Sequence, residues 1–168
     1  GLTRHVGVSN FSAPKIDRLI ETVGVVPAVN QIDLHPFLQQ NELLAFLRSH
    51  GIVATAYSPL GSRGRPAGMR ADDEPNLLEH PDVVEIARAH DATPAQVLIA
   101  WALARDTAVI PKSITTTRIR ENLEAAKLSL TPTDLDRLSA LDRGARFVKG
   151  DFWCPPGSPY TMATLWDE

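Results

Sequence analysis

The segment IPKSITTTRIREN (110–122) brings together side chains that could bind an anion. An apolar run ends at Pro111 and is followed by Lys112, a row of hydroxyl residues and Arg118. A phosphate group is held by cations together with hydroxyl or backbone N–H donors, and a helix starting near Thr117 would add its positive end. An ordinary solvated helix start of the same composition is the alternative.

Polar side chains follow three earlier apolar runs as well. The pairs are Ser9 with Asn10, Asn30 with Gln31, and Tyr57 with Ser58. Hydroxyl and amide groups can both donate and accept hydrogen bonds, and a tyrosine ring offers a surface for stacking. These residues become a candidate site if the fold brings the ends of the runs together.

The apolar runs read as strands, and amphipathic or capped helices separate them. The expected strands are 4–11, 26–34, 52–60 and 107–113, and the expected helices are 13–24, 40–51, 81–91, 93–106, 116–129 and 131–144. Ser12 and Thr93 are predicted N-caps, each with a proline in the first turn, and Gly24 closes the first helix. A tail rich in proline, glycine and aromatic residues follows from residue 145.

Strands that alternate with helices and are nearly continuous in apolar residues indicate a parallel sheet covered by helices. An open doubly wound sheet and a (β/α)8 barrel both fit. All four polar clusters stand at the C-terminal ends of their strands, where a barrel binds its ligands, and this favours the barrel. The sequence contains no Gly-x-Gly-x-x-Gly turn, which argues against a dinucleotide site of the Rossmann type.

Composition narrows the possible partners. The chain has 168 residues, 43% of them hydrophobic, and a net charge of −3, which gives no reason to expect nucleic acid or an anionic membrane as a partner. The single cysteine, Cys154, suits a cytoplasmic protein, and no segment reaches membrane-spanning length. The chain starts with GLTRHVGV and lacks an initiator methionine, so we expect it to begin within a longer protein.

Four ordered motifs carry a resemblance to a known family. VGVSNF (6–11), NQIDLHPFLQQ (30–40), AYSPLGS (56–62) and IPKSITTTRIREN (110–122) resemble the successive signatures of the aldo-keto reductases. The resemblance implies a TIM-type (β/α)8 barrel that uses NADP(H) to reduce aldehydes or ketones to alcohols. Residues 1–143 would be the last four β/α units of the barrel, and residues 144–168 would be a tail that can line the substrate pocket.

The resemblance also implies a cofactor site. Lys112, Ser113, Thr115 and Arg118 would hold the 2′-phosphate, and Glu121 and Asn122 would face the adenine. Ser9, Asn10 and Gln31 would bind the nicotinamide carboxamide, Tyr57 would stack on its ring, and Ser58, Leu60 and Ser62 would follow the pyrophosphate. Ile110 completes the set of cofactor residues carried over. No metal site is expected.

The loop after SPLGS departs from the family pattern. Where many relatives carry an aspartate that latches over the cofactor, this chain has Gly64. The loop arginines, Arg63, Arg65 and Arg70, could approach the pyrophosphate instead, or could form a solvated loop balanced by Asp72, Asp73 and Glu74. His35 is expected to be structural.

No catalytic residue is assigned. The family's proton donor, a tyrosine assisted by a lysine, an aspartate and a histidine, belongs to the first half of the barrel, and hydride transfer to a carbonyl requires that proton. We therefore expect a cofactor-binding half-barrel completed by an N-terminal half or by a second copy, acting on a small carbonyl or alcohol substrate. A non-catalytic NADP(H)-sensing module and an inactive fragment are the alternatives. The substrate itself is not specified by the sequence.

Overall fold

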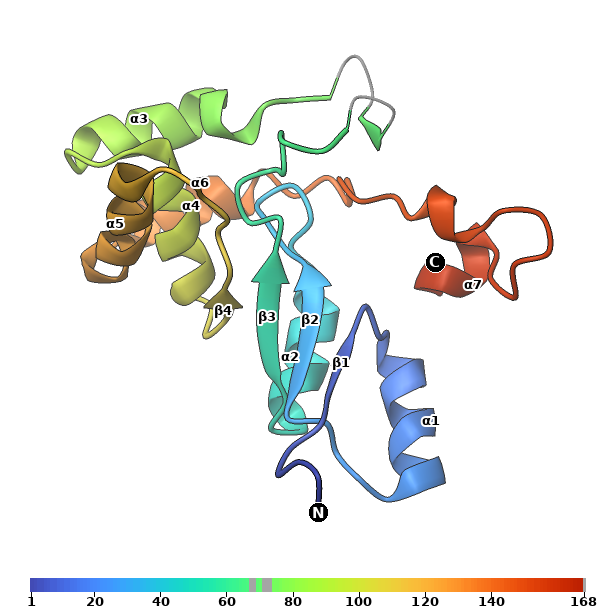
Figure 1. Ribbon diagram of the computed structural model, residues 1–168. Helices are drawn as coiled ribbons and strands as arrows, with labels where there is room; N and C mark the ends of the chain where they lie inside the picture. Colours follow the sequence, from blue (N-terminus) through green and yellow to red (C-terminus); the bar gives the residue numbers. More distant parts are fainter. Residues whose placement is uncertain (67–68, 71–73, 168) are drawn as a thin grey trace.

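The computed structural model describes residues 1–66, 69–70 and 74–167. Its centre is a four-stranded parallel sheet with the strands in chain order (Figure 1). The strands are β1 (Gly7–Ser9), β2 (Val29–Asp33), β3 (Val53–Tyr57) and β4 (Ala108–Val109). The helices are α1 (Ala13–Val23), α2 (Asn41–Ser49), α3 (Pro81–Ala89), α4 (Pro94–Leu103), α5 (Thr116–Glu124), α6 (Pro132–Ser139) and α7 (Met162–Trp166). Short 3₁₀ turns are η2 (Leu77–Glu79), η3 (Ala125–Lys127) and η4 (Asp151–Trp153).

Local sequence signals account for the helix ends. The Ser12 hydroxyl accepts a hydrogen bond from the Lys15 N–H and begins α1, and Gly24 ends that helix with a φ of 67°, in the left-handed region that favours glycine. Thr93 begins α4 with a reciprocal capping box to Gln96. These predicted caps are confirmed.

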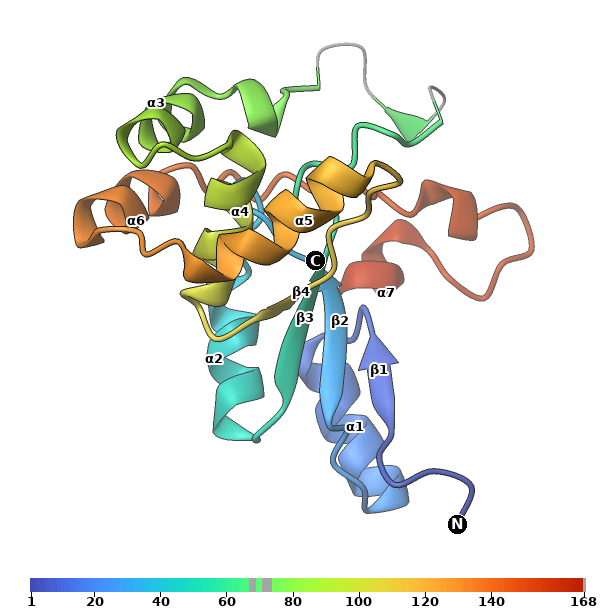
Figure 2. The same ribbon diagram turned by 60° about the vertical axis from the view of Figure 1, so that its left-hand side comes forward.

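The strand register shows which side chains share a face of the sheet. Val29 lies opposite Val53 and Gln31 opposite Thr55, whereas Ile32 lies opposite Ala56. Because side chains alternate along a strand, the first set shares one face and Ile32 shares the other. The helices α1 and α2 lie behind the strands in Figure 2, on the side of Ile32.

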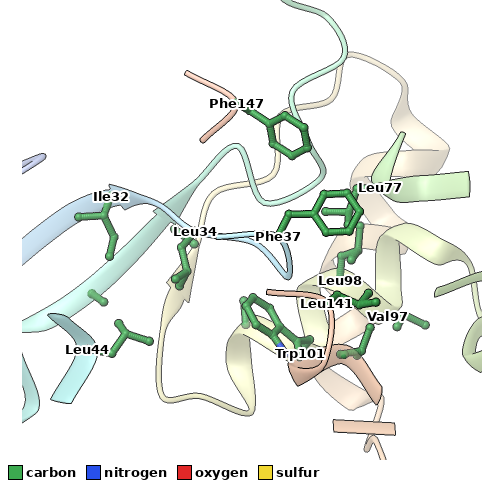
Figure 3. Close-up of a cluster of buried hydrophobic side chains, with 14 of the residues drawn as sticks. Ile32, Leu34, Phe37, Leu44, Leu77, Val97, Leu98, Trp101, Leu141 and Phe147 are labelled. Atoms are coloured by element: carbon green, nitrogen blue, oxygen red, sulfur yellow. The ribbon is translucent and has the colours of Figure 1, made fainter. Parts of the chain in front are cut away.

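The main core lies between the sheet and these helices and continues beneath α4 (Figure 3). Six consecutive residues of α4, from Val97 to Ala102, are buried, as in a helix covered on all sides. Trp101, Phe37 and Leu98 are among its largest fully buried side chains. The helices α3 to α6 gather beside the β4 edge, and the C-terminal tail runs to the other side (Figure 1).

The opposite face of the sheet is open. Val29 and Val53 are 37% and 47% exposed, whereas Ile32 and Ala56 on the covered face are 2% and 0% exposed. Parallel sheets are normally covered on both faces. Among the described residues this face therefore lacks a covering layer, and the outer edges of β1 and β4 have no paired strand.

Two expectations need correction. The first strand looked buried in sequence, but Gly7 and Ser9 are exposed because no strand pairs with the outer edge of β1 among the described residues. The sequence assigned no helix or strand to the tail, and the structure places η4 and α7 there. A capping box between Thr161 and Thr164 begins α7, a signal that the surrounding prolines and glycines had hidden.

Candidate functional site

The C-terminal strand ends converge, as predicted. Ser9 lies opposite Gln31, and Asp33, two residues further along β2, lies opposite Tyr57 at the end of β3. Lys112 follows β4 by three residues at the same end of the sheet. Three of the polar clusters therefore lie at this end of one parallel sheet. The prediction was wrong for Asn30 and Gln31, which lie in the middle of β2, although Gln31 is opposite Ser9 at the end of β1.

Tyr57 lies on the open face of the sheet, where its ring is available for stacking. Burial raises the pKa of its hydroxyl, and the negative charge of Asp33 raises the pKa further, while the neighbouring Asn10 amide opposes the shift. Tyr57 thus keeps its proton through the physiological range. Such a hydroxyl suits a packing role rather than proton transfer at neutral pH.

Three of the predicted cofactor residues have a left-handed backbone. Asn10, Ser58 and Ser62 have φ angles of 60°, 51° and 50°. Side chains other than glycine adopt this region at a cost, and such residues gather at binding and catalytic sites. The Asn10 N–H donates to the Gln31 carbonyl at 2.9 Å, and the Ser9 hydroxyl donates to the same oxygen at 3.0 Å. These bonds hold the β1 end against β2.

The start of α5 has no side-chain cap, unlike the starts of α1, α4 and α6 but like those of α2 and α3. Thr115 occupies its N-cap position, but no side chain caps the free N–H groups of the first turn. The Ser113 hydroxyl accepts from the Thr115 N–H at 3.1 Å, one step before the helix. The first-turn N–H groups therefore remain available to an anion, and the helix dipole favours one there.

The cations beside this helix start also lack partners within the described chain. Lys112 and Arg118 are exposed and form no ion pair with any described carboxylate. In contrast, Arg137 on α6 contacts both Asp82 and Glu85 of α3. An uncapped helix start with two unpaired cations is the geometry expected of a phosphate site.

The remaining predicted cofactor residues lie around the strand ends and the start of α5. Ile110 donates its N–H to the Ala56 carbonyl at 3.2 Å and is 48% exposed. Leu60 packs against the core. Glu121 and Asn122 are half-buried on α5, and the Gln96 side chain donates to the Glu121 carbonyl at 3.2 Å. Asn30, in contrast, is buried on the covered face and exchanges hydrogen bonds with the Phe11 backbone, so it is structural.

Sequence reasoning missed Asp33, a fully buried carboxylate on the open-face side of β2. Burial raises its pKa to about 6, while hydrogen bonds from the tail backbone and the charges of Arg146 and Arg65 act in the opposite direction. Side chains alternate along a strand, so Asp33, two residues after Gln31, shares its face and could have been predicted as a site residue.

His35 is buried in the core, as expected for a structural residue. Its ring lies 4.3 Å from that of Phe147, and its Nε2 is 3.5 Å from Asp33 Oδ1. Burial and two nearby arginines lower its pKa to about 3, so the imidazole is neutral at ordinary pH.

The loop after β3 is held by an ion pair between two of its own residues. Arg65 is almost buried and donates to both carboxylate oxygens of Glu74, at 2.5 and 2.6 Å. This pairing fits the alternative in which the loop balances its own charge, and Arg65 is not solvated. Asp72 and Asp73, the other expected counter-charges, lie outside the described residues. None of the described helices has the length and apolar character of a membrane span.

Comparison with known proteins identifies the protein family. The profile of the Aldo/keto reductase family matches residues 1–143. The chain therefore belongs to the aldo/keto reductase family, and its fold is part of that family's (β/α) barrel. The predicted family is confirmed.

Individual proteins with similar sequences or structures support the same family assignment. The chain is 49% identical over all 168 residues to Aldo/keto reductase slr0942 of Synechocystis, of which it covers 51%. It is 43% identical over 148 residues, 88% of this chain, to rat Aldo-keto reductase family 1 member A1, of which it covers 45%. The solved apo structure of Gox0644 matches 83% of the chain with a TM-score of 0.73 and 38% identity, and 47% of that structure is covered. The chain thus spans about half the length of these relatives.

Proposed function

We propose that this chain is the NADP(H)-binding part of an oxidoreductase that reduces aldehydes or ketones to alcohols. The observation that carries the proposal is the uncapped start of α5 beside Lys112 and Arg118. NADP(H) differs from NAD(H) by a 2′-phosphate, and this group requires such donors and cations. Family membership supplies the reaction class.

The residues of the strand ends fit the rest of such a cofactor. Gln31 and Ser9 lie opposite each other. The Gln31 amide can both donate to and accept from a carboxamide, and the Ser9 hydroxyl, whose proton goes to the Gln31 backbone carbonyl, can accept from it. Tyr57 offers its ring on the open face, and Ser58 to Ser62 lead away from it along the loop. Bound NADPH would supply the hydride, and these side chains would fix which face of its ring is presented.

Neither tyrosine of the chain offers a suitable proton donor. Burial raises the pKa of Tyr57, which makes its hydroxyl a weaker acid, and Tyr160 lies in the tail, 53% exposed. We therefore assign no catalytic residue to this chain and propose that the proton donor is supplied by another half-barrel. The open face with Val29 and Val53, and the exposed Ile119 and Leu123 on α5, are the surfaces that such a half would cover. A second copy of the chain is the alternative occupant.

Cofactor selectivity tests the proposal. Arg118→Ala and Lys112→Met should each weaken NADPH binding by about 1.5–3 kcal/mol, or roughly 10- to 150-fold, while NADH binding changes little. Fluorescence titration of each variant and of the unmodified protein with NADPH and with NADH measures these changes in affinity. The protein should carry both half-barrels, because the nicotinamide site is open in this half alone.

Arg137→Ala is the matched control. It removes a cation that is already paired with Asp82 and Glu85 on the outer helices, so it should leave both cofactor affinities unchanged. Equal losses for NADPH and NADH in the α5 variants would reject a 2′-phosphate site there. If NADPH binds as proposed but no aldehyde is reduced, a non-catalytic NADP(H)-binding module becomes the better interpretation.

A further inference from the structure

Asp33 is a buried carboxylate at the end of β2 that has no part in the proposed cofactor site. It is 0% exposed, and it lies directly opposite Tyr57 in the neighbouring strand. Residues that lie opposite each other in a sheet project their side chains on the same face, so Asp33 shares the face of Tyr57. A buried acidic group therefore stands beside the ring that is proposed to stack on the nicotinamide.

The two oxygens of this carboxylate are bonded unequally. Oδ2 accepts a hydrogen bond from the Val148 N–H at 3.1 Å. Oδ1 has no hydrogen-bond partner of good geometry among the described residues, although Nε2 of His35 lies 3.5 Å away. A buried carboxylate normally has its oxygens bonded, because an unbonded one loses its hydration without compensation. The negative charge of Asp33 is therefore only partly offset by its contacts.

The titratable and charged groups around Asp33 come from every element packed against it. They are Arg146 of the tail, Arg65 of the loop after β3, His35 beyond β2 and Tyr57 of β3. Arg65 is itself paired with Glu74, and burial lowers the pKa of His35 to about 3, so its ring is neutral. Burial of Asp33 outweighs the effect of both arginines and raises its pKa to about 6. Asp33 is consequently negatively charged at neutral pH.

The charge of Asp33 acts on Tyr57. Burial and then the negative charge of Asp33 raise the pKa of the Tyr57 hydroxyl, and the effect of Asp33 is larger than the opposing effect of Arg146. Electrostatic interactions weaken only slowly with distance where water is excluded, so a ring stacked on Tyr57 would experience the same negative potential. The nicotinamide ring is neutral in NADPH and carries one positive charge in NADP⁺. A negative potential at this place therefore favours the oxidised cofactor.

We propose that Asp33 makes the site discriminate between the two redox states of the cofactor, because its carboxylate beside Tyr57 stabilises the positively charged nicotinamide. This inference rests on the proposed NADP(H)-binding function. Asp33 exchanges no proton with the substrate and acts through its charge alone. Stabilisation of bound NADP⁺ relative to bound NADPH also favours reduction of a carbonyl over the reverse reaction.

Binding of the two redox states tests the proposal without requiring activity. Asp33→Asn keeps the size of the side chain and an oxygen that can accept from the Val148 N–H, but it removes the charge. In the protein that carries both half-barrels, the Kd for NADP⁺ at pH 7.5 should rise about tenfold, whereas the Kd for NADPH should stay within about threefold. Isothermal titration calorimetry with each cofactor measures both constants.

The pH dependence of binding gives a second readout in the unmodified protein. Protonation of Asp33, with its pKa of about 6, removes the negative charge, so NADP⁺ should bind more weakly as the pH falls. The ratio of the NADP⁺ Kd to the NADPH Kd should rise about fivefold between pH 7.5 and pH 5. The 2′-phosphate is common to both cofactors, so its own titration cancels in this ratio. In Asp33→Asn the ratio should be constant over the same range.

Asp134→Asn is the matched control. Asp134 is a nearly buried carboxylate that caps α6 and contacts His90 at 2.8 Å, and it has no contact with the strand ends among the interactions of the described chain. Its substitution should lower thermal stability without changing the ratio of the two dissociation constants or the dependence of this ratio on pH.

The outcomes separate this proposal from the proposed function. An unchanged ratio in a folded Asp33→Asn protein, or the same change in Asp134→Asn, would overturn the role of Asp33. A ratio that does not vary with pH in the unmodified protein would overturn it as well, even if Asp33→Asn fails to fold. If neither cofactor binds, the proposed function fails and the role of Asp33 fails with it. If both bind with a constant ratio, only the role of Asp33 is rejected.

Discussion

The helix-covered side of this sheet and its open side are built in different ways. On the covered side, Ile32 and Ala56 are buried, Arg137 is paired with two carboxylates, and α4 and α6 begin with reciprocal capping boxes. On the open side, Val29 and Val53 are exposed. Beside the β4 edge, α5 begins without a side-chain cap, next to Lys112 and Arg118, which form no ion pair with a described carboxylate. Apolar side chains of the open face and cations at the α5 start therefore remain available for binding.

This difference separates stability from function. Capped helix starts and paired cations need nothing from outside the chain, whereas an uncapped helix start and an uncovered apolar strand face gain free energy only when something binds them. The open face and the start of α5 are therefore two separate sites of binding. One is apolar and extended and fits another half-barrel, and the other is cationic and local and fits a phosphate.

Substitution of one residue on each face of the sheet should have very different effects on stability. Ile32→Ala should destabilise the protein by about 2–5 kcal/mol, because it removes side-chain volume from a closed core. Val53→Ala should cost less than about 1 kcal/mol in this chain alone, because the valine is 47% exposed. Urea unfolding of both variants measures the two losses.

Covering the open face should change the cost of only one of these two substitutions. When a second half-barrel covers the open face, the cost of Val53→Ala should rise toward that of Ile32→Ala, because Val53 then loses a buried contact. Equal costs of the two substitutions in the isolated chain would contradict the assignment of an open face.

The sequence predicted most of the covered side and the position of the strand ends. Ser12, Gly24 and Thr93 act locally, so their capping roles could be recognised from a few neighbouring residues. Asp33 was missed because its hydrogen bond to the Val148 N–H joins residues 115 positions apart, and no local pattern encodes that contact. The α7 helix was missed because its cap stands within a segment of turn-forming residues.

Acid stability offers a smaller test. His35 has a pKa of about 3 in the folded protein, well below its ordinary value of 6.5. Below pH 6.5 the unfolded chain takes up a proton that the buried imidazole does not. The stability associated with this residue is therefore complete above pH 6.5 and is lost as the pH falls.

Between pH 7 and pH 5 this loss amounts to about 2 kcal/mol, and His35→Gln should remove it. Asp33, with its pKa raised to about 6, acts in the opposite direction over the same range, since the folded protein takes up that proton first. The measurement is therefore the difference in unfolding free energy between pH 7 and pH 5, compared between the variant and the unmodified protein. Identical pH dependence in the two proteins would contradict a buried neutral His35.

The most direct test of the account uses a ligand that reaches only the α5 start. Adenosine 2′,5′-bisphosphate carries the 2′-phosphate but no nicotinamide, and 5′-AMP lacks the 2′-phosphate. Titration of each into the isotope-labelled protein, followed by NMR of the backbone amides, compares the two without requiring a complete nicotinamide site. The account predicts that the bisphosphate binds at least about tenfold more tightly, with the largest shifts between Ser113 and Arg118. Equal affinities, or shifts confined to other parts of the chain, would contradict a phosphate site at this helix start.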